Sequence, residues 1–379
     1  MAKQVRPMGR FHLSTEARAL RGGVTASCAA FSGEPTPVRQ APMSQPDEQP
    51  LGRTATWITR RPLTSYFALC FAISWGLLIS FGPLYARGVV IIVPVLMLAL
   101  FGPALAGMVV SGVLNPGPKH GAPGRRILAF FLTWLVATPV FVFSPELRRE
   151  GITLSVGLVV VSAAVALIPA FIVSSAFSRT PGIRALLEPL VIPRGHAGWY
   201  LAAVLITPAL LVLSIAVEMV LGREPASPRV SVDGGWPSVV IAFSLSAAYR
   251  FFFANACGEE PGWRGFALPR LEARYSPLVA NLILALFWAL WHLPLPQARG
   301  LGNPAAFVEY YVGTFSHCIL ISWLFNRTGG SILVAGLLHV FSNVSRLYIP
   351  ETSAFLVIRP AFCLALVVIQ GMWRKPVRA

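Results

Sequence analysis

Long apolar runs separated by short polar connections fill most of this chain. Each run approaches the ~20 residues that an α-helix needs to cross the hydrocarbon core of a bilayer. The runs occupy residues 64–84, 89–113, 127–143, 152–177, 199–221, 237–257, 277–293, 307–325, 331–348 and 354–372. Backbone in lipid must satisfy its own hydrogen bonds, so we expect these runs to be helices. The pattern predicts an all-α fold, a polytopic transmembrane bundle of about 8–10 membrane-spanning helices, with ten as the best count.

The composition supports a membrane protein. Of the 379 residues, 55% are hydrophobic and only 12% are charged, whereas a soluble globular protein has about 25% charged residues. The formal net charge of +16 raises the question of nucleic-acid binding. The 31 lysines and arginines, however, are scattered through connections and tails instead of forming one basic face with aromatics, so we expect no nucleic-acid partner.

The basic residues also predict the orientation in the membrane. Cytoplasmic connections of membrane proteins carry an excess of Lys and Arg. When the N-terminus is placed inside and the connections alternate, most of the basic residues fall on the inner side. We therefore expect a multi-pass cell-membrane protein with its N-terminus and C-terminus cytoplasmic.

Four regions follow from this pattern. Residues 1–60 have no sustained apolar period and are rich in Arg, Ser, Pro and Gly, which is typical of a disordered basic cytoplasmic tail. A transit peptide or a start site chosen too far upstream would have the same composition. We then expect N-terminal transmembrane helices over 61–235, a transmembrane core over 236–348 that contains the polar motifs described below, and a last helix with a basic C-terminal tail over 349–379.

Five cysteines, at positions 28, 70, 257, 318 and 363, have no metal-binding or redox spacing. Most of them lie in or beside apolar runs. We interpret them as small buried hydrophobic residues.

The most unusual stretch is residues 258–266, which read GEEPGWRGF at the end of an apolar run. Ionisable residues at membrane depth are costly and usually functional. On a continuous helix, Glu260 and Arg264 would share a face, and Glu259 would point about 100° away. Pro261 disfavours a continuous helix and predicts a kink or a helix end here. The alternative to a functional site is an acidic interfacial loop anchored by Trp263.

Two later segments supply partners for these acids. His292 ends the run 277–293, while His339 and Asn343, four residues apart, present imidazole and amide on one helix face. Acid, imidazole and amide together suit general acid–base catalysis with a hydrogen-bond donor for an oxyanion. A purely structural histidine, or a polar bridge between helices, is the alternative. We assign no role to the other histidines, His12, His120, His196 and His317.

One further polar pair lies within the apolar runs. Glu218 and Arg250 are both in or near predicted helices. They are candidates to pair with each other or to line a wet cavity.

The three segments resemble the three motifs of the CPBP family, the CAAX-protease and bacteriocin-processing intramembrane proteases also called the Abi family. These motifs are Glu-Glu-x-x-x-Arg, Phe-x-x-x-His and His-x-x-x-Asn, in that order. Glu259, Glu260 and Arg264 match the first, and His339 and Asn343 match the third. The second departs from the pattern, because Trp288 stands four residues before His292 where the family has Phe.

The resemblance implies hydrolysis of a peptide bond in a membrane-associated peptide or protein, next to membrane lipid. Glu259 and His292 would activate a water, Glu260 and Arg264 would position them, and His339 and Asn343 would stabilise the oxyanion. Alternatively, Glu259, His292 and His339 would hold a divalent metal such as zinc. The absence of a His-Glu-x-x-His element favours the metal-free route. A non-proteolytic scaffold or regulator of the same fold, and a proton-coupled transporter, are competing functions.

Overall fold

The computed structural model describes residues 52–117, 123–224, 227–295 and 303–375. All regular elements in these ranges are helices, so the predicted all-α class is confirmed. Residues 1–51 of the predicted tail lie outside the described residues. The helices all belong to one unit, residues 51–379.

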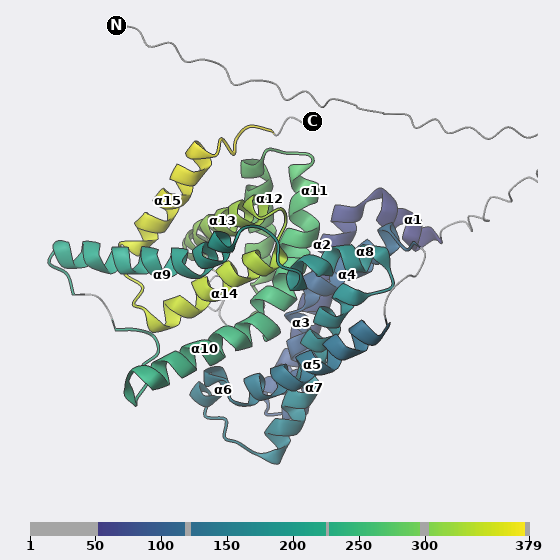
Figure 1. The fold of residues 1–379 in the computed structure, drawn as a ribbon, viewed down its shortest axis with the longest axis horizontal. Coiled ribbons are helices and arrows are strands. Elements are labelled where there is room, and N and C mark those ends of the chain that lie inside the picture. The colour runs from purple at the N-terminus through teal and green to yellow at the C-terminus, as the bar shows by residue number, and fades with distance from the viewer. Residues whose placement is uncertain (1–51, 118–122, 225–226, 296–302, 376–379) are drawn as a thin grey trace, which may run out of the picture. The chain divides into compact units, whose positions relative to one another are not determined.

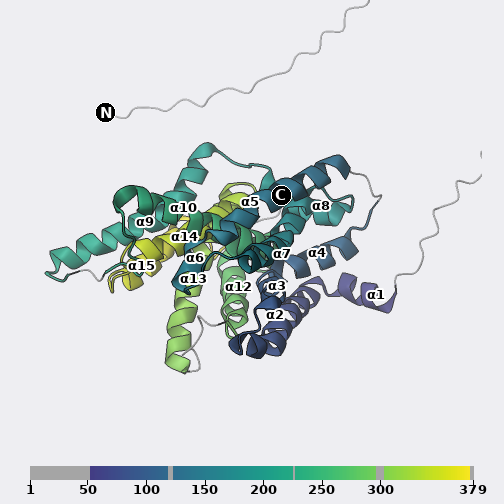
Figure 2. The same cartoon turned by 90° about the horizontal axis from the view of Figure 1, so that it is seen from below.

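The helices follow one another with short connections (Figures 1 and 2). The first part of the chain contains α1 (Arg53–Arg60), α2 (Pro62–Ala86), η1 (Val90–Ile92), α3 (Val93–Ala99), α4 (Gly102–Leu114), α5 (Pro123–Val142), α6 (Pro145–Arg149), α7 (Val156–Ser174), η2 (Ser175–Phe177), α8 (Pro181–Val191) and α9 (Ala197–Val220). The second part contains α10 (Gly235–Phe253), η3 (Asn255–Glu259), η4 (Pro261–Ala267), α11 (Leu268–Glu272), α12 (Pro277–Trp291), α13 (Pro304–Arg327), α14 (Ile332–Tyr348) and α15 (Phe355–Ile369).

Each of the ten predicted apolar runs contains a helix, and the transmembrane character is confirmed. Among the described residues, five helices are long and apolar enough to cross a membrane, or six if one bent pair counts as a single span. Three of the remaining apolar helices, α12, α14 and α15, have only 15 to 17 residues. The difference from a count of ten therefore comes from the shortness of these three helices and from the less apolar composition of α13, which has 24 residues, and not from missing helices.

The bent pair consists of α3 and α4, which form one predicted run. The two helices meet at an angle of 55°, with Pro103 in the first turn of α4. Proline lacks the backbone N–H that would continue the helix. The hydroxyl of Ser74 in α2 donates to the Ala99 carbonyl at 2.7 Å, which satisfies a backbone group at the break.

The predicted tail extends too far toward the C-terminus. Residues 53–60 form the helix α1, although the sequence predicts disorder up to residue 60. The reason is tertiary: Ile58 is buried in the main hydrophobic core, and α1 packs against α2 and α4. The boundaries at residues 235 and 348 stay predictions.

Helix α14 lies at the centre of the second part. It packs against α9, α10, α13 and the segment η3, and Figure 1 shows it between α9 and α10. Helix α4 packs against η3 and η4 from the other side. The segment 255–267 is therefore enclosed by helices from both parts of the chain.

Small residues allow this close packing. In the stretch 102–107 of α4, Gly102, Pro103, Ala104, Ala106 and Gly107 are all buried. The four cysteines within the described residues are buried and free, as expected for small hydrophobic side chains; Cys28 lies outside these residues.

Candidate active site

The acidic motif lies on an irregular helix. Helix α10 ends at Phe253, Ala254 breaks it with φ −145° and ψ −95°, and the chain continues as two π-helical segments, η3 and η4. π-Helical turns are rare and are frequent at functional sites. The main break therefore precedes the two acids instead of falling at Pro261, where the sequence predicts it. Both acids are held on helical backbone.

Two glycines of the motif have no room for a side chain. A Cβ at Gly258 would lie 2.8 Å from the Leu100 carbonyl oxygen, and one at Gly262 would lie 2.3 Å from that of Pro103. Both distances are below any normal contact, and the opposing atoms are backbone. The glycines thus let the motif sit directly against the start of α4.

Glu260 joins the first and third motifs. Its Oε1 accepts hydrogen bonds from Arg264 Nη1 at 3.1 Å and from His339 Nδ1 at 2.7 Å. Glu260 and Arg264 have no exposed surface, and His339 is 2% exposed. The predicted shared face of Glu260 and Arg264 is present. Because an ionised carboxylate only accepts hydrogen bonds, His339 presents Nδ1–H to it.

Glu259 points to different partners. Its Oε1 accepts from Asn255 Nδ2 at 3.0 Å, and its Oε2 accepts from Trp288 Nε1 at 2.7 Å. The side chain is 4% exposed. Each carboxylate oxygen has a second acceptor position, so Glu259 can still accept a hydrogen bond from a water.

His292 follows the last turn of α12, as the sequence predicts. Its Nδ1 lies 2.8 Å from the carbonyl oxygen of Trp288. A carbonyl accepts only, so Nδ1 carries the proton and the neutral ring keeps a free acceptor at Nε2. The residue is partly exposed, unlike the two acids. Trp288 thus contacts Glu259 through its indole N–H and His292 through its backbone.

Asn343 contacts the site through a residue outside the motifs. Its Nδ2 donates to Asn255 Oδ1 at 3.2 Å, and Asn255 in turn donates to Glu259. Sequence reasoning missed Asn255, although it lies four residues before Glu259. A polar residue one helical turn from a functional acid is the signal that identifies it.

Aromatic contacts complete the cluster around Trp288. The centroid of its ring lies 5.1 Å from that of His339 and 5.6 Å from that of His317, and the Arg264 guanidinium carbon lies 4.6 Å from the ring centroid. His317, to which the sequence assigned no role, comes from α13. It is 8% exposed, with Nε2 unpartnered. Sequence offers no signal for His317 beyond a polar residue in an apolar run.

The structure therefore brings all six predicted site residues into one network. Residues 241–345, which contain all of them, match the family model of the type II CAAX prenyl endopeptidases, Rce1-like. This match supports a CPBP-family protease. The CAAX prenyl protease 2 of Methanococcus maripaludis is 27% identical to it over 151 residues, which are 38% of this chain and 53% of that relative. The chain thus spans about half the length of the curated relative it matches.

The predicted metal ligands of this CPBP site do not converge. Within the described ranges, no three His, Cys, Asp or Glu side chains are placed to hold a metal ion. Both oxygens of Glu259 accept N–H donors, and His339 Nδ1 is directed to Glu260. The three side chains are therefore not grouped as a zinc site in this arrangement.

The suggested pairing of Glu218 with Arg250 is wrong. Glu218 interacts with Arg223 and accepts from the Ala354 backbone N–H, while Arg250 lies 3.8 Å from Glu146. The two residues are on α9 and α10, and each finds a partner on a neighbouring connection or helix. Neither lies in the CPBP network.

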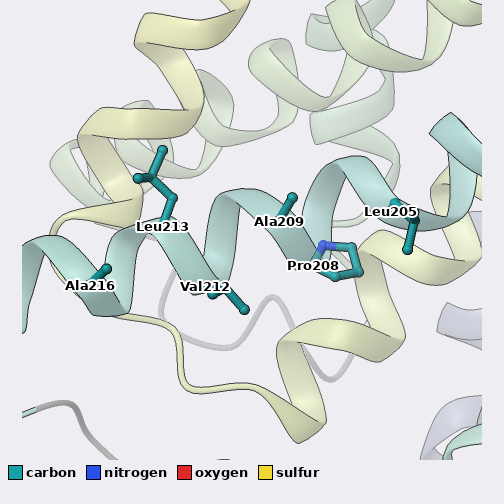
Figure 3. Close-up of a pocket in the computed structure, with 6 residues that line it drawn as sticks. All are labelled: Leu205, Pro208, Ala209, Val212, Leu213 and Ala216. Atoms are coloured by element: carbon teal, nitrogen blue, oxygen red, sulfur yellow. The ribbon is translucent and has the colours of Figure 1, made fainter.

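A surface pocket lies apart from this network, on α9 (Figure 3). All its lining residues are apolar, and none belongs to the three motifs. They are Leu205, Pro208, Ala209, Val212, Leu213 and Ala216. The inner side of α9 instead contacts the site helix, because Thr207 and Ser342 share a hydrogen bond of 2.6 Å.

Proposed function

We propose that this protein is an intramembrane endopeptidase of the CAAX prenyl type. Its substrate would be a membrane-associated peptide or protein with a prenylated, C-terminal CAAX sequence. The observation that carries the proposal is the buried network in which Asn255 and Trp288 connect the motif residues from η3, α12 and α14. A scaffold or a transporter would not require this set of acid, imidazole and amide, and no observation favours either function.

Glu259 and His292 are the groups that would activate water. Both present free acceptor positions, Glu259 on its carboxylate and His292 at Nε2, and both are held by Trp288. A general base has to lie within hydrogen-bonding reach of the proton that it removes. His292 is partly exposed beside the buried acid, which supports a route for water to Glu259.

His339 and Asn343 would stabilise the negative charge that develops on the substrate oxygen. One N–H of the Asn343 side-chain amide donates to Asn255, and the second N–H of that amide is available to an oxyanion. Glu260 accepts from Nδ1 of His339, so a protonated His339 would direct its Nε2–H to the same oxygen. Donors aimed at developing charge in a dry site contribute strongly to catalysis.

The proposed step is balanced as a hydrolysis. The water oxygen bonds to the scissile carbonyl carbon while Glu259 takes one water proton, and an oxyanion forms. The C–N bond then breaks, the oxyanion returns to a carbonyl, and a proton passes from Glu259 to the leaving amine. Arg264 stays paired with Glu260 throughout and keeps that buried carboxylate charged.

The test is cleavage of a prenylated peptide by the full-length protein in detergent or proteoliposomes. We expect the wild type to cut the peptide, and Glu259→Gln and His292→Ala to lose at least a hundredfold in kcat, since each removes a group that handles the water. A chelator should leave the activity unchanged if water activation is metal-free.

Two outcomes would contradict the proposal. One is a wild type that folds as well as its variants but cleaves no prenylated peptide. The other is full activity in Glu259→Gln. Loss of activity on chelation, restored by adding zinc, would keep the endopeptidase and overturn the metal-free route.

A further inference from the structure

A buried arginine in α15 has no partner of its own. Arg359 is 8% exposed, its Nε has no hydrogen-bond partner, and no described acidic residue forms an ion pair with it. Its guanidinium lies 5.1 Å from the centroid of the Phe355 ring. A charge buried at membrane depth is costly unless an anion neutralises it. Arg359 is therefore suited to bind an anionic group.

Glu351, the acidic residue that interacts electrostatically with Arg359, already forms ion pairs with other arginines. Arg346 and Glu351 are the charged groups that interact electrostatically with Arg359. Glu351 accepts from Arg346 at 2.7 Å and from Arg229 at 2.9 Å. Two other arginines thus already pair with the glutamate, and Arg359 forms no ion pair with it.

Arg359 lies next to the helix that supplies His317. A Cβ at Gly313 of α13 would lie 2.9 Å from Arg359 Nη2, so the guanidinium packs directly against this helix. Gly313 and His317 are four residues apart and share a helix face. The centroid of the His317 ring lies 5.1 Å from that of His339. The guanidinium therefore contacts α13 about one helical turn, ~5.4 Å along the helix axis, from the residue whose ring contacts the site.

We propose that Arg359 binds the free C-terminal carboxylate of the substrate. The inference rests on the proposed function, because in a CAAX sequence three residues follow the prenylated cysteine. Three extended residues span roughly 10 Å, the same scale as the path from His339 through His317 to Arg359. Arginine and carboxylate form strong, bidentate hydrogen bonds. Arg359 would thus set how far from the chain end the peptide is cut.

The experiment is equilibrium binding of two prenylated CAAX peptides to the full-length protein in detergent. The peptides differ only at the C-terminus, one a free carboxylate and the other an amide. We expect the wild type to bind the carboxylate at least tenfold more tightly, since a charged bidentate pair is lost with the amide. Arg359→Gln should bind both peptides with the affinity of the amide.

A matched variant is Arg229→Gln, which removes an exposed arginine from the same cluster. It should keep the wild-type preference. Thermal unfolding in detergent tests the folding of each variant. If Arg359→Gln does not fold, Arg359→Lys keeps the charge without the bidentate geometry and should narrow the preference.

Equal binding of the two peptides to the wild type would overturn the inference, as would an undiminished preference in folded Arg359→Gln. Binding is measured without turnover, so the two proposals can fail separately. A wild type that prefers the carboxylate but cleaves neither peptide would support the Arg359 site and contradict the endopeptidase. Cleavage of both peptides without a binding preference would support the endopeptidase and contradict the Arg359 site.

Discussion

Trp288 is the residue at which this chain departs from the family motif. The motif has Phe at this position, and a Phe side chain supplies an aromatic ring only. Here the indole N–H donates to Glu259 at 2.7 Å. Because a hydrogen bond to a charged group is stronger than one between neutral groups, Trp288 both orients Glu259 and stabilises it as a carboxylate.

Replacement of Trp288 by Phe tests this role. We expect Trp288→Phe to lower kcat by about tenfold to a hundredfold, the range for a lost hydrogen bond to a charged group. KM should change little, because the indole N–H is directed to Glu259 and not to the substrate. Steady-state kinetics with a prenylated peptide, measured from acid to alkaline pH, separates kcat, KM and the pH profile.

Trp263→Phe is the matched control. Trp263 is also fully buried, but its Nε1 has no partner, so this variant removes a similar ring volume without removing a hydrogen bond. Equal losses of kcat in the two variants, with unchanged pH profiles, would show that packing alone explains Trp288.

The six catalytic candidates follow from the sequence because motif spacing is local. Glu260 and Arg264 are four residues apart, and so are His339 and Asn343, which places each pair on one helix face. Which groups meet across helices was not predictable in this way. Asn255 and Trp288 belong to the site through contacts with Glu259. Asn255 lies one helical turn before Glu259 and could have been found from that spacing, but the contact of Trp288 with Glu259 joins two helices and no local pattern indicates it.

At the scale of the element, the close approach of η4 to α4 depends on Gly262. A Cβ there would lie 2.3 Å from the Pro103 carbonyl oxygen, and a backbone carbonyl at the start of a helix has little freedom to move. Introducing atoms into a filled core costs about 1–3 kcal/mol. We expect Gly262→Ala to lower the unfolding temperature in detergent and to abolish most peptide cleavage, because Glu259 and Glu260 would shift with the segment.

Gly76→Ala is the control for this prediction. Gly76 lies in α2, and a Cβ there would meet no atom within 4 Å. Alanine has the higher helix propensity, so the unfolding temperature should stay the same or rise. Wild-type stability and cleavage in Gly262→Ala would show that the motif does not need this contact.

The helices were predictable from apolar runs, but their interruptions were only partly so. Pro103 in an apolar run explains the bend between α3 and α4. Pro261, in contrast, is the first residue of η4 and does not end the helical backbone that carries the acids. Proline is tolerated in the first turn of a helix, and the glycines on either side let the segment pack against the backbone of Leu100 and Pro103. Such tertiary support does not appear in the periodicity of a single segment.

For the whole molecule, helix length and the number of membrane crossings are separate questions. Helices α12, α14 and α15 have 15, 17 and 15 residues, so they are about 22–26 Å long. The hydrocarbon core of a typical bilayer is about 30 Å thick. A short helix reaches both sides only where the bilayer thins or where flanking residues extend to the interface. The active-site helices α12 and α14 are among the short ones, which favours a locally thinned and wetter membrane around the site.

The distribution of basic residues gives a prediction for the orientation in the membrane. Most of the 31 lysines and arginines fall on the connections that alternate with an inside N-terminus, and the bias of such connections toward the cytoplasm sets topology. We expect a fluorescent protein fused after Ala379 to be fluorescent in bacterial cells. A phosphatase fused after Glu150, in the connection between α5 and α7, should be active in the periplasm. In the controls the two fusions are exchanged, so that the phosphatase follows Ala379 and the fluorescent protein follows Glu150. We expect neither phosphatase activity nor fluorescence in these controls. An active phosphatase at the C-terminus would contradict this orientation. It would mean an odd number of membrane crossings, so at least one of the short helices would not span the bilayer.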